Sequence, residues 1–350
     1  MKTGKTLGIN QILKNYMNKL KFIAETAWHH EGDFNFMKKL VNSICKKSKA
    51  DIVKLHITLD FDSYMSVNHP SYSTLKRWLF SKNQWNKLIK IIRENKKELM
   101  LLVNDIKAID YASKVKPEYV EVHSVCLNVP SILETIKNKL DIKTKIVFGV
   151  GGSTIEEIDR ALQYFEDRHC ILMFGFQNYP TSYKDINLKK IRKIQEIYKK
   201  HQFGYADHTD WNHNQNQFIT LLISSNNMDF VEKHITIRPG KKRTDFSAAV
   251  SINSFNDIVK QGQIVSEISG DGSLNLNKSE KSYSIFGPNK MTAVATKNIS
   301  KGKIIKKDDF IFIRTGKVSN FSQLDALNNF GSKLRKDIKK NEILKKDHFA

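Results

Sequence analysis

The sequence feature that most constrains the fold is a regular alternation of short apolar runs with amphipathic stretches. Between the apolar runs, apolar residues recur at helical spacing, as in QWNKLIKIIRENKK and TIEEIDRALQYFED. A strand–helix alternation repeated eight times is typical of a (β/α)8 barrel. We therefore expect an α/β protein in which residues 1–262 form a TIM barrel. The expected strands cover residues 21–27, 50–57, 98–105, 119–124, 145–151, 169–176, 203–209 and 228–237.

The composition changes after residue 262. Residues 263–286 are rich in Ser, Gly and Asn, which predicts a linker. Beyond the linker, KNISKGKIIKKDDF (297–310) matches KDIKKNEILKKDHF (336–349) at an offset of 39 residues. Because the Ile, Asp and Phe positions match as well as the lysines, chance similarity is a weak explanation. We expect residues 287–350 to form a small, pseudo-symmetric, β-rich domain.

The chain carries a formal net charge of +22, a value that raises the question of nucleic-acid binding. Its lysines are spread over the whole length, as in SICKKSKAD, RENKKE and KKNEILKKD, mainly where amphipathic helices would face water. A nucleic-acid interface would combine a basic face with exposed aromatic residues or a known module, and the sequence shows neither. We expect a solvated, lysine-rich surface that helps to attract anionic substrates, and no nucleic-acid partner.

The cysteines and the apolar runs bear on the cellular compartment. Cys45, Cys126 and Cys170 lie far apart and lack CxxC spacing, so neither a disulfide framework nor a zinc–thiolate site is indicated. No apolar run reaches the roughly 20 residues of a membrane span. The first 22 residues lack the apolar core of a signal peptide. We therefore expect a cytoplasmic protein without membrane contact.

Polar residues interrupt the apolar pattern near the carboxyl ends of the expected strands, where barrel enzymes place their active sites. Burying a polar group without a partner is costly, so polar residues at these positions are candidates for a function. Residues two apart on a strand face the same way. In chain order the candidates are Glu25, Lys54, His56, Asn104, Glu121, His123, Gly149, Gly151, Asn178, Tyr179, His208 and His234.

Two of these candidates predict a metal site. His208 and His234 end adjacent strands, so their imidazoles are expected to converge at the barrel mouth. Two imidazoles can bind a divalent ion and leave its other coordination positions open for water or a substrate oxygen. Each histidine taken alone is more often a structural residue, and the matching height of the pair favours the metal.

Several segments match known motifs in order and spacing, from about residue 21 to the end. IAETAWHHEGD is similar to IAEIGxNHxGD, NYPTSYKDINL to NYPTPxxDxNL, GYADHT to GYSDHT, and EKHITI to EKHFTL. These are motifs of the sialic acid synthase family, which the chain therefore resembles. The tail AVATKNISKGKIIKKDDFIFIRTG resembles the SAF (antifreeze-like, β-clip) domain that closes this family. The pair GYxDHT and EKHxT is the most specific part of the resemblance.

The resemblance implies a reaction and a set of roles. Phosphoenolpyruvate would add to the open-chain aldehyde of an N-acetylated hexosamine, with Mn²⁺ or Mg²⁺ polarising the aldehyde oxygen. His208 and His234 would hold the ion, Glu25 would handle a proton or water, and Lys54 would neutralise the phosphoenolpyruvate. Arg314 would reach the sugar from the SAF domain of a partner subunit, which implies a homodimer. The positions expected to contact substrate are His56, Glu121, Asn178, Tyr179, Asp245 and Arg314.

The sequence departs from this family where the phosphate would bind. Glu121 stands where the family offers Lys, and Ala206 replaces the Ser of GYSDHT. Asn104 and Gly149 replace a Thr and a Ser in less securely aligned segments. A buried carboxylate needs a cation, so we predict that Glu121 pairs with Lys54 and lowers the positive potential at the phosphate position. The alternative is a one-residue slip of the strand, which would leave Glu121 on the outer face against a helix.

Three functions remain open. The first is a nonulosonic acid synthase that makes a sialic, legionaminic or similar acid for a surface polysaccharide. The second is a divergent metal-dependent barrel lyase or transferase with a non-phosphorylated carbonyl donor. The third is a catalytically inactive sugar-binding homologue. Retention of Glu25, His208 and His234 counts against the third.

Overall fold

The computed structural model describes residues 20–175, 178–270 and 272–349, which belong to two compact units. The first unit ends at Asp271 and the second begins at Gly272. Two predictions concern residues outside the described ranges. Residues 1–19 make up most of the segment in which no signal peptide is expected, and residue 176 ends the sixth expected strand. None of the helices in the described ranges has both the length and the apolar character that crossing a bilayer requires.

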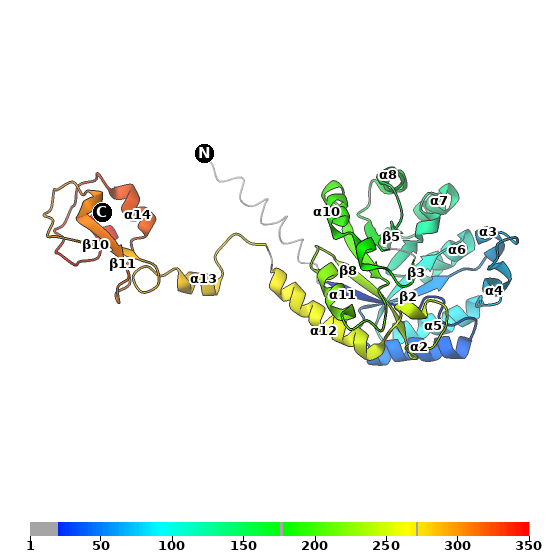
Figure 1. Ribbon diagram of the computed structural model, residues 1–350. Coiled ribbons are helices and arrows are strands. Elements are labelled where there is room, and N and C mark those ends of the chain that lie inside the picture. Colours follow the sequence, from blue (N-terminus) through cyan, green and yellow to red (C-terminus); the bar gives the residue numbers. More distant parts are fainter. Residues whose placement is uncertain (1–19, 176–177, 271, 350) are drawn as a thin grey trace. The chain divides into compact units, whose positions relative to one another are not determined.

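The first unit is a closed barrel of eight parallel strands, which confirms the predicted TIM barrel (Figure 1). Each strand pairs with the next along the chain, and β1 also pairs with β8, so the sheet has no open edge within the barrel. Each of the eight expected runs overlaps one strand. The strands are β1 (Lys21–Glu25), β2 (Ile52–Ile57), β3 (Glu98–Val103), β4 (Tyr119–Val122), β5 (Lys145–Gly149), β6 (Ile171–Phe174), β7 (Gln202–Asp207) and β8 (Phe230–Thr236).

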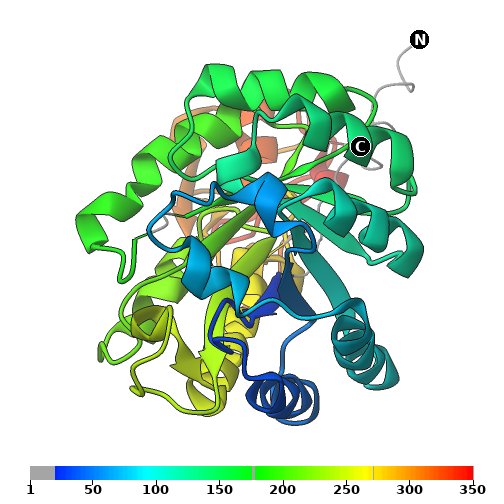
Figure 2. The same cartoon turned by 90° about the vertical axis from the view of Figure 1, so that its right-hand side faces the viewer.

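Helices surround these strands on the outside, as Figure 2 shows. Their ends carry the expected signals: Asp33 caps the helix that begins at Phe34, and Thr154 forms a capping box with Glu157. The long helices are α2 (Phe34–Lys47), α5 (Lys82–Glu94), α6 (Ile106–Val115), α7 (Pro130–Lys139), α8 (Ile155–Leu162), α10 (Leu188–Ile197), α11 (Asn216–Ser224) and α12 (Ile252–Ser269). Short helices are α3 (Phe61–Tyr64), α4 (Tyr72–Lys76) and α9 (Tyr183–Ile186), and a two-residue strand, β9 (Val250–Ser251), pairs with β8.

The barrel interior has an apolar floor and a polar layer above it. The floor is a buried cluster that includes Ile23, Ile52, Met100, Tyr119, Val147, Ile171 and Phe230. Because side chains alternate along a strand, the residues two positions further on share the same inward face. On β1, β2, β4 and β8 those residues are Glu25, Lys54, Glu121 and Glu232. The fold thus collects charged side chains from four strands into one buried layer.

The second unit contains the sequence repeat, and its backbone is arranged around a local two-fold axis. Ile299 and Ile338, which are equivalent in the two copies, exchange both backbone hydrogen bonds at 2.8 and 2.9 Å. Gly302 N donates to Leu334 O, and the equivalent Asn341 N donates to Ala295 O, each at 2.8 Å. The predicted pseudo-symmetry is therefore present in the structure.

This unit has its own apolar core around Ile305 and Leu344, which are also equivalent. Its regular elements are short: α13 (Lys278–Tyr283), an antiparallel pair of β10 (Thr292–Ala295) with β11 (Phe310–Ile313), and α14 (Gln323–Asn329). Its assignment to the SAF class remains a prediction.

The barrel domain extends further than residue 262. Helix α12 continues to Ser269, and the two units divide between residues 271 and 272. The expected linker at 263–286 therefore begins too early and contains the short helix α13. Apolar residues at helical spacing, Phe255, Ile258 and Val259, bury the first half of this helix against the barrel. Its more exposed final turns continue a helix that tertiary packing has already fixed.

Candidate active site

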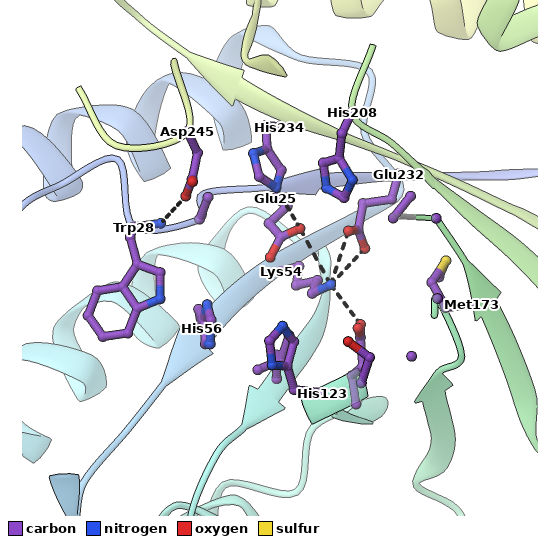
Figure 3. Close-up of a pocket in the computed structure, with 18 of the residues that line it drawn as sticks. Glu25, Trp28, Lys54, His56, His123, Met173, His208, Glu232, His234 and Asp245 are labelled. Carbon is purple, nitrogen blue, oxygen red and sulfur yellow. Dashed lines mark hydrogen bonds and ion pairs between the residues drawn. The ribbon is translucent and has the colours of Figure 1, made fainter. Parts of the chain in front are cut away.

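A buried ion cluster lies at the centre of the polar layer (Figure 3). Lys54 Nζ lies 2.7 Å from Glu121 Oε2 and donates to both carboxylate oxygens of Glu232 at 3.0 Å. A third carboxylate, Glu25, lies 3.4 Å from the same nitrogen. The side chains of Lys54 and all three carboxylates are at most 7% exposed. The predicted pairing of Glu121 with Lys54 is therefore present, but Lys54 is shared among three acids.

Proton affinities in this cluster follow from burial and from the excess of acids. Burial raises the pKa of Glu121 to about 7, although Lys54 opposes the shift. Burial and the neighbouring Glu25 raise the pKa of Glu232 well above its usual 4.5. Burial alone would lower the pKa of Lys54, but the carboxylates outweigh it and hold that pKa well above 10.5. The lysine stays charged, and Glu232 keeps its proton well above pH 4.5.

Glu25, His208 and His234 form a second group at the edge of this cluster. One ligand atom from each lies within 4.8 Å of the others, and all three residues are buried. His234 Nε2 is 3.2 Å from Glu25 Oε2, and the two imidazole rings have centroids 4.7 Å apart. The rings converge as expected, and the structure adds Glu25 as a third donor beside them.

The protonation of this group suits a divalent cation. Burial, together with the neighbouring imidazole, lowers the pKa of His208 well below 6.5, and burial does the same for His234. Both rings are therefore neutral at pH 7, the form that binds metal. His234 Nδ1 is buried without a hydrogen-bond partner among the described residues. Two neutral imidazoles and a carboxylate are a common ligand set for first-row divalent ions.

On the opposite side of the cavity lies a histidine pair. His56 Nε2 accepts a hydrogen bond from Asn104 Nδ2 at 2.8 Å, and the same amide nitrogen donates to Thr58 Oγ1. The His123 ring lies 5.5 Å from the His56 ring. Burial and the His123 ring lower the pKa of His56 well below 6.5, so His56 is a neutral polar group facing the cavity.

Tyr179 and Asp245 lie near the group formed by Glu25, His208 and His234. The Tyr179 ring is 4.9 Å from the His208 ring and 5.6 Å from the His234 ring. Asp245 accepts a hydrogen bond from the Trp28 backbone nitrogen at 3.4 Å. Burial raises the pKa of Asp245 to about 6 and also raises the pKa of Tyr179.

This pKa predicts a pH dependence for any ligand whose hydroxyl groups Asp245 binds. Below about pH 6, Asp245 is protonated and is a poorer hydrogen-bond acceptor; above it, the carboxylate is ionised. The KM for such a ligand is therefore expected to fall as pH rises from about 5 to about 7. Steady-state kinetics across this range test the prediction, and an Asp245→Asn variant should lose that inflection. An unchanged profile in the variant would contradict the assignment.

These residues line a cavity of about 210 Å³ at the carboxyl ends of the strands. Four carboxylates face it, from Glu25, Glu121, Glu232 and Asp245. Among the described lining residues, Lys54 is the only lysine or arginine. The cavity therefore combines four acidic side chains and one lysine with neutral histidines, which favours a cation and disfavours an unaccompanied polyanion.

One barrel residue predicted to contact substrate, Asn178, does not line this cavity. Asn178 is exposed, and its backbone carbonyl and side-chain oxygens accept hydrogen bonds from Thr181 Oγ1. Arg314 is exposed in the second unit, where its guanidinium group donates to the Pro288 carbonyl. Asn178 thus stabilises a turn, and the substrate contact of Arg314 remains a prediction.

Sequence reasoning missed Glu232 and Trp28, both of which line the cavity. Glu232 lies two residues before His234 on β8, so the same-face rule that paired Lys54 with His56 would have found it. Trp28 occupies a variable position of the first motif and lies in a loop, where no periodicity indicates the direction of a side chain.

Comparisons with known proteins identify the family of this chain. The model of the NeuB family matches residues 40–274. The N,N'-diacetyllegionaminic acid synthase of Campylobacter jejuni is 25% identical over 355 residues, covering 94% of this chain and 100% of that protein. The similarity therefore extends over both units of the chain.

Solved structures show the same fold. The N-acetylneuraminic acid (sialic acid) synthetase of Leptospira borgpetersenii, solved with citrate, has a TM-score of 0.68 at 20% identity and covers 76% of this chain and 90% of its own. A spore coat polysaccharide biosynthesis protein from Bacillus subtilis covers 95% of each chain, with a TM-score of 0.60 at 17% identity.

Proposed function

The chain belongs to the NeuB family, and on that premise we propose that it is a cytoplasmic nonulosonic acid synthase acting in surface polysaccharide biosynthesis. The proposed substrates are phosphoenolpyruvate and the open-chain aldehyde of an N-acylated hexosamine. The methylene carbon of the donor forms a bond to the aldehyde carbon. Water adds to the donor carbon that bears the phosphate, and inorganic phosphate leaves.

The observation that carries this proposal is the convergence of Glu25, His208 and His234 at the mouth of the barrel. These residues would hold a divalent ion, Mn²⁺ or Mg²⁺, which when bound supplies Lewis-acid polarisation of the aldehyde oxygen. Glu25 also lies 3.4 Å from Lys54, and in this proposal its carboxylate would accept or return a proton during the reaction. Tyr179 and Asp245 would hold the acceptor above them.

Product formation is the direct test of this function. The purified chain would be incubated with phosphoenolpyruvate, Mn²⁺ and either N-acetylmannosamine or a diacetamido hexose. We expect a nonulosonic acid by mass spectrometry and an equal amount of inorganic phosphate. A metal-loaded protein that gives neither product with either acceptor would contradict the proposal.

Removal of metal is expected to abolish this activity reversibly. Chelation by EDTA should stop turnover, because the neutral imidazoles alone provide no Lewis acid. Added Mn²⁺ should restore turnover, and metal analysis should show one ion per chain bound at this group. Full activity in a preparation shown to be metal-free would contradict this prediction.

A second candidate function is favoured by one observation, the sharing of Lys54 among three carboxylates. A lysine paired in this way offers little positive potential to a phosphate group. The same carbon–carbon bond could instead be made with a non-phosphorylated carbonyl donor such as pyruvate, as a metal-dependent lyase would do. Calorimetric titration with phosphoenolpyruvate and with pyruvate, both in the presence of Mn²⁺, separates the two candidates.

We also propose a homodimer in which a C-terminal SAF domain, residues 287–350, completes the barrel site of the other subunit. The resemblance to sialic acid synthases supports this arrangement, and the exposed guanidinium of Arg314 suits hydroxyl and carboxylate groups. In this arrangement Arg314 approaches the partner's Asp245 and the partner's Tyr179.

Mixing two inactive variants tests this arrangement. Arg314→Ala and His208→Ala chains should each be nearly inactive alone. After unfolding and refolding together, they should regain activity, because a mixed dimer has one site with both native residues. A monomer in sedimentation experiments that keeps full activity would contradict the proposal.

A further inference from the structure

Two loops at the mouth of the barrel are tied together by hydrogen bonds. They are residues 28–31, after β1, and residues 243–245, after β8. Thr244 donates from its backbone nitrogen and its hydroxyl to Glu31 Oε1, at 2.7 and 3.2 Å. Arg243 Nη1 donates to the His29 carbonyl at 3.1 Å, and His29 Nδ1 contacts the Thr244 carbonyl. With the bond from Trp28 to Asp245, these contacts form a set that we call the loop clamp.

The backbone of the loop clamp is held in unfavourable conformations. Glu31 and Asp245 have φ values of 46° and 63°, and Ala27, just before the first loop, has a φ of 47°. This left-handed region is uncommon for residues with a β-carbon and persists only where the surroundings enforce it. Such residues gather at binding sites, where they fix side-chain direction. The clamp supplies that enforcement here.

The side chains that the clamp directs to the cavity are those of Trp28 and Asp245 (Figure 3). The Trp28 ring is partly exposed and lies 5.2 Å from the His56 ring. Trp78 supports it at a ring distance of 6.3 Å without lining the cavity. No residue that the structure describes forms a hydrogen bond with the indole nitrogen of Trp28. The wall therefore offers an aromatic face, an N–H donor and a carboxylate.

We propose that Trp28 is a specificity-determining residue, whose indole packs against the acyl group and C–H face of an open-chain amino sugar while Asp245 accepts its hydroxyl groups. The inference rests on the proposed function for the class of ligand. Aromatic side chains with a polar handle suit ligands that have both apolar and polar edges, as acylated sugars do. Because no lysine or arginine among the described residues lines this wall, it suits an uncharged chain better than an anion.

The experiment uses the full chain with Mn²⁺ and one probe, N-acetylmannosaminitol, which is the reduced, open-chain form of N-acetylmannosamine. Calorimetry gives its dissociation constant, and tryptophan fluorescence reports contact with an indole. In the native protein the probe should bind and change the fluorescence. Trp28→Ala should raise the dissociation constant about tenfold, and Trp28→Phe, which keeps an aromatic face, should raise it less.

The matched control is Trp211→Phe, which removes an indole that does not line the cavity. This variant should keep the fluorescence change, whereas Trp28→Phe should lose it. The inference would be overturned by unchanged probe affinity in Trp28→Ala, by a fluorescence change that survives in Trp28→Phe, or by failure of the native protein to bind the probe. Since the probe cannot react, loss of synthase activity with normal probe binding would count against the proposed reaction alone.

Glu31 provides an independent test of the clamp as a positioning device. Glu31→Ala removes the carboxylate that accepts the hydrogen bonds from Thr244. It should raise the KM for the amino sugar, with a smaller effect on kcat. Glu31→Gln keeps a carbonyl oxygen at the same place and should restore most of the affinity. Equal effects of the two variants, or a change confined to thermal stability, would contradict the positioning role.

Discussion

Replacing His208 with alanine is expected to lower kcat by at least about a thousandfold, because loss of one imidazole would remove the proposed metal ion and the several kcal/mol of Lewis-acid stabilisation that it would supply. The ring lies at the rim of the barrel, above the apolar floor, so the fold should persist. Steady-state kinetics at saturating Mn²⁺, metal analysis and a thermal melt by circular dichroism measure the three effects.

The control for this prediction is His213→Ala. His213 is an exposed histidine that follows the same strand and does not line the cavity, so its removal should leave kcat unchanged. A His208→Ala protein that binds the metal normally and turns over at the native rate would contradict the metal assignment. An unfolded variant would instead show in the melt, and His208→Asn would then replace it.

Exchanging Glu121 for lysine, together with Ala206→Ser, is expected to raise the affinity for phosphoenolpyruvate by more than tenfold. The change leaves two lysines facing Glu25 and Glu232, so Lys54 is no longer outnumbered. Each charge-assisted hydrogen bond to phosphate is worth ~1.5–3 kcal/mol. Isothermal titration with phosphoenolpyruvate in the presence of Mn²⁺ measures the gain.

Glu121→Gln is the matched control for this exchange. It removes the negative charge without adding a positive one, so we expect a smaller gain in phosphoenolpyruvate affinity than lysine gives. Micromolar affinity in the native protein would show that Glu121 does not obstruct the donor. A native protein that binds pyruvate but not phosphoenolpyruvate would favour the non-phosphorylated donor.

Much of the barrel could be predicted because its signals are local. A buried strand needs a short apolar run and a surface helix needs apolar residues at helical spacing, and both patterns are visible in the sequence. Rules for residue direction along a strand then placed Glu25, Lys54 and His208 at the mouth, where the structure has them. The 39-residue repeat likewise predicted the pseudo-symmetry around Ile299 and Ile338.

The sequence alone thus determined the strand order, the inward faces and the two histidines that approach one another on neighbouring strands. Only the tertiary structure decided that Lys54 is shared by three acids and that the Trp28 and Asp245 loops form one wall. Charge sharing depends on distances across the barrel between strands far apart in the sequence, and a loop has no periodicity to fix where a side chain points. Local sequence patterns determine which way a side chain points from its strand, whereas closure of the barrel determines which side chains it meets.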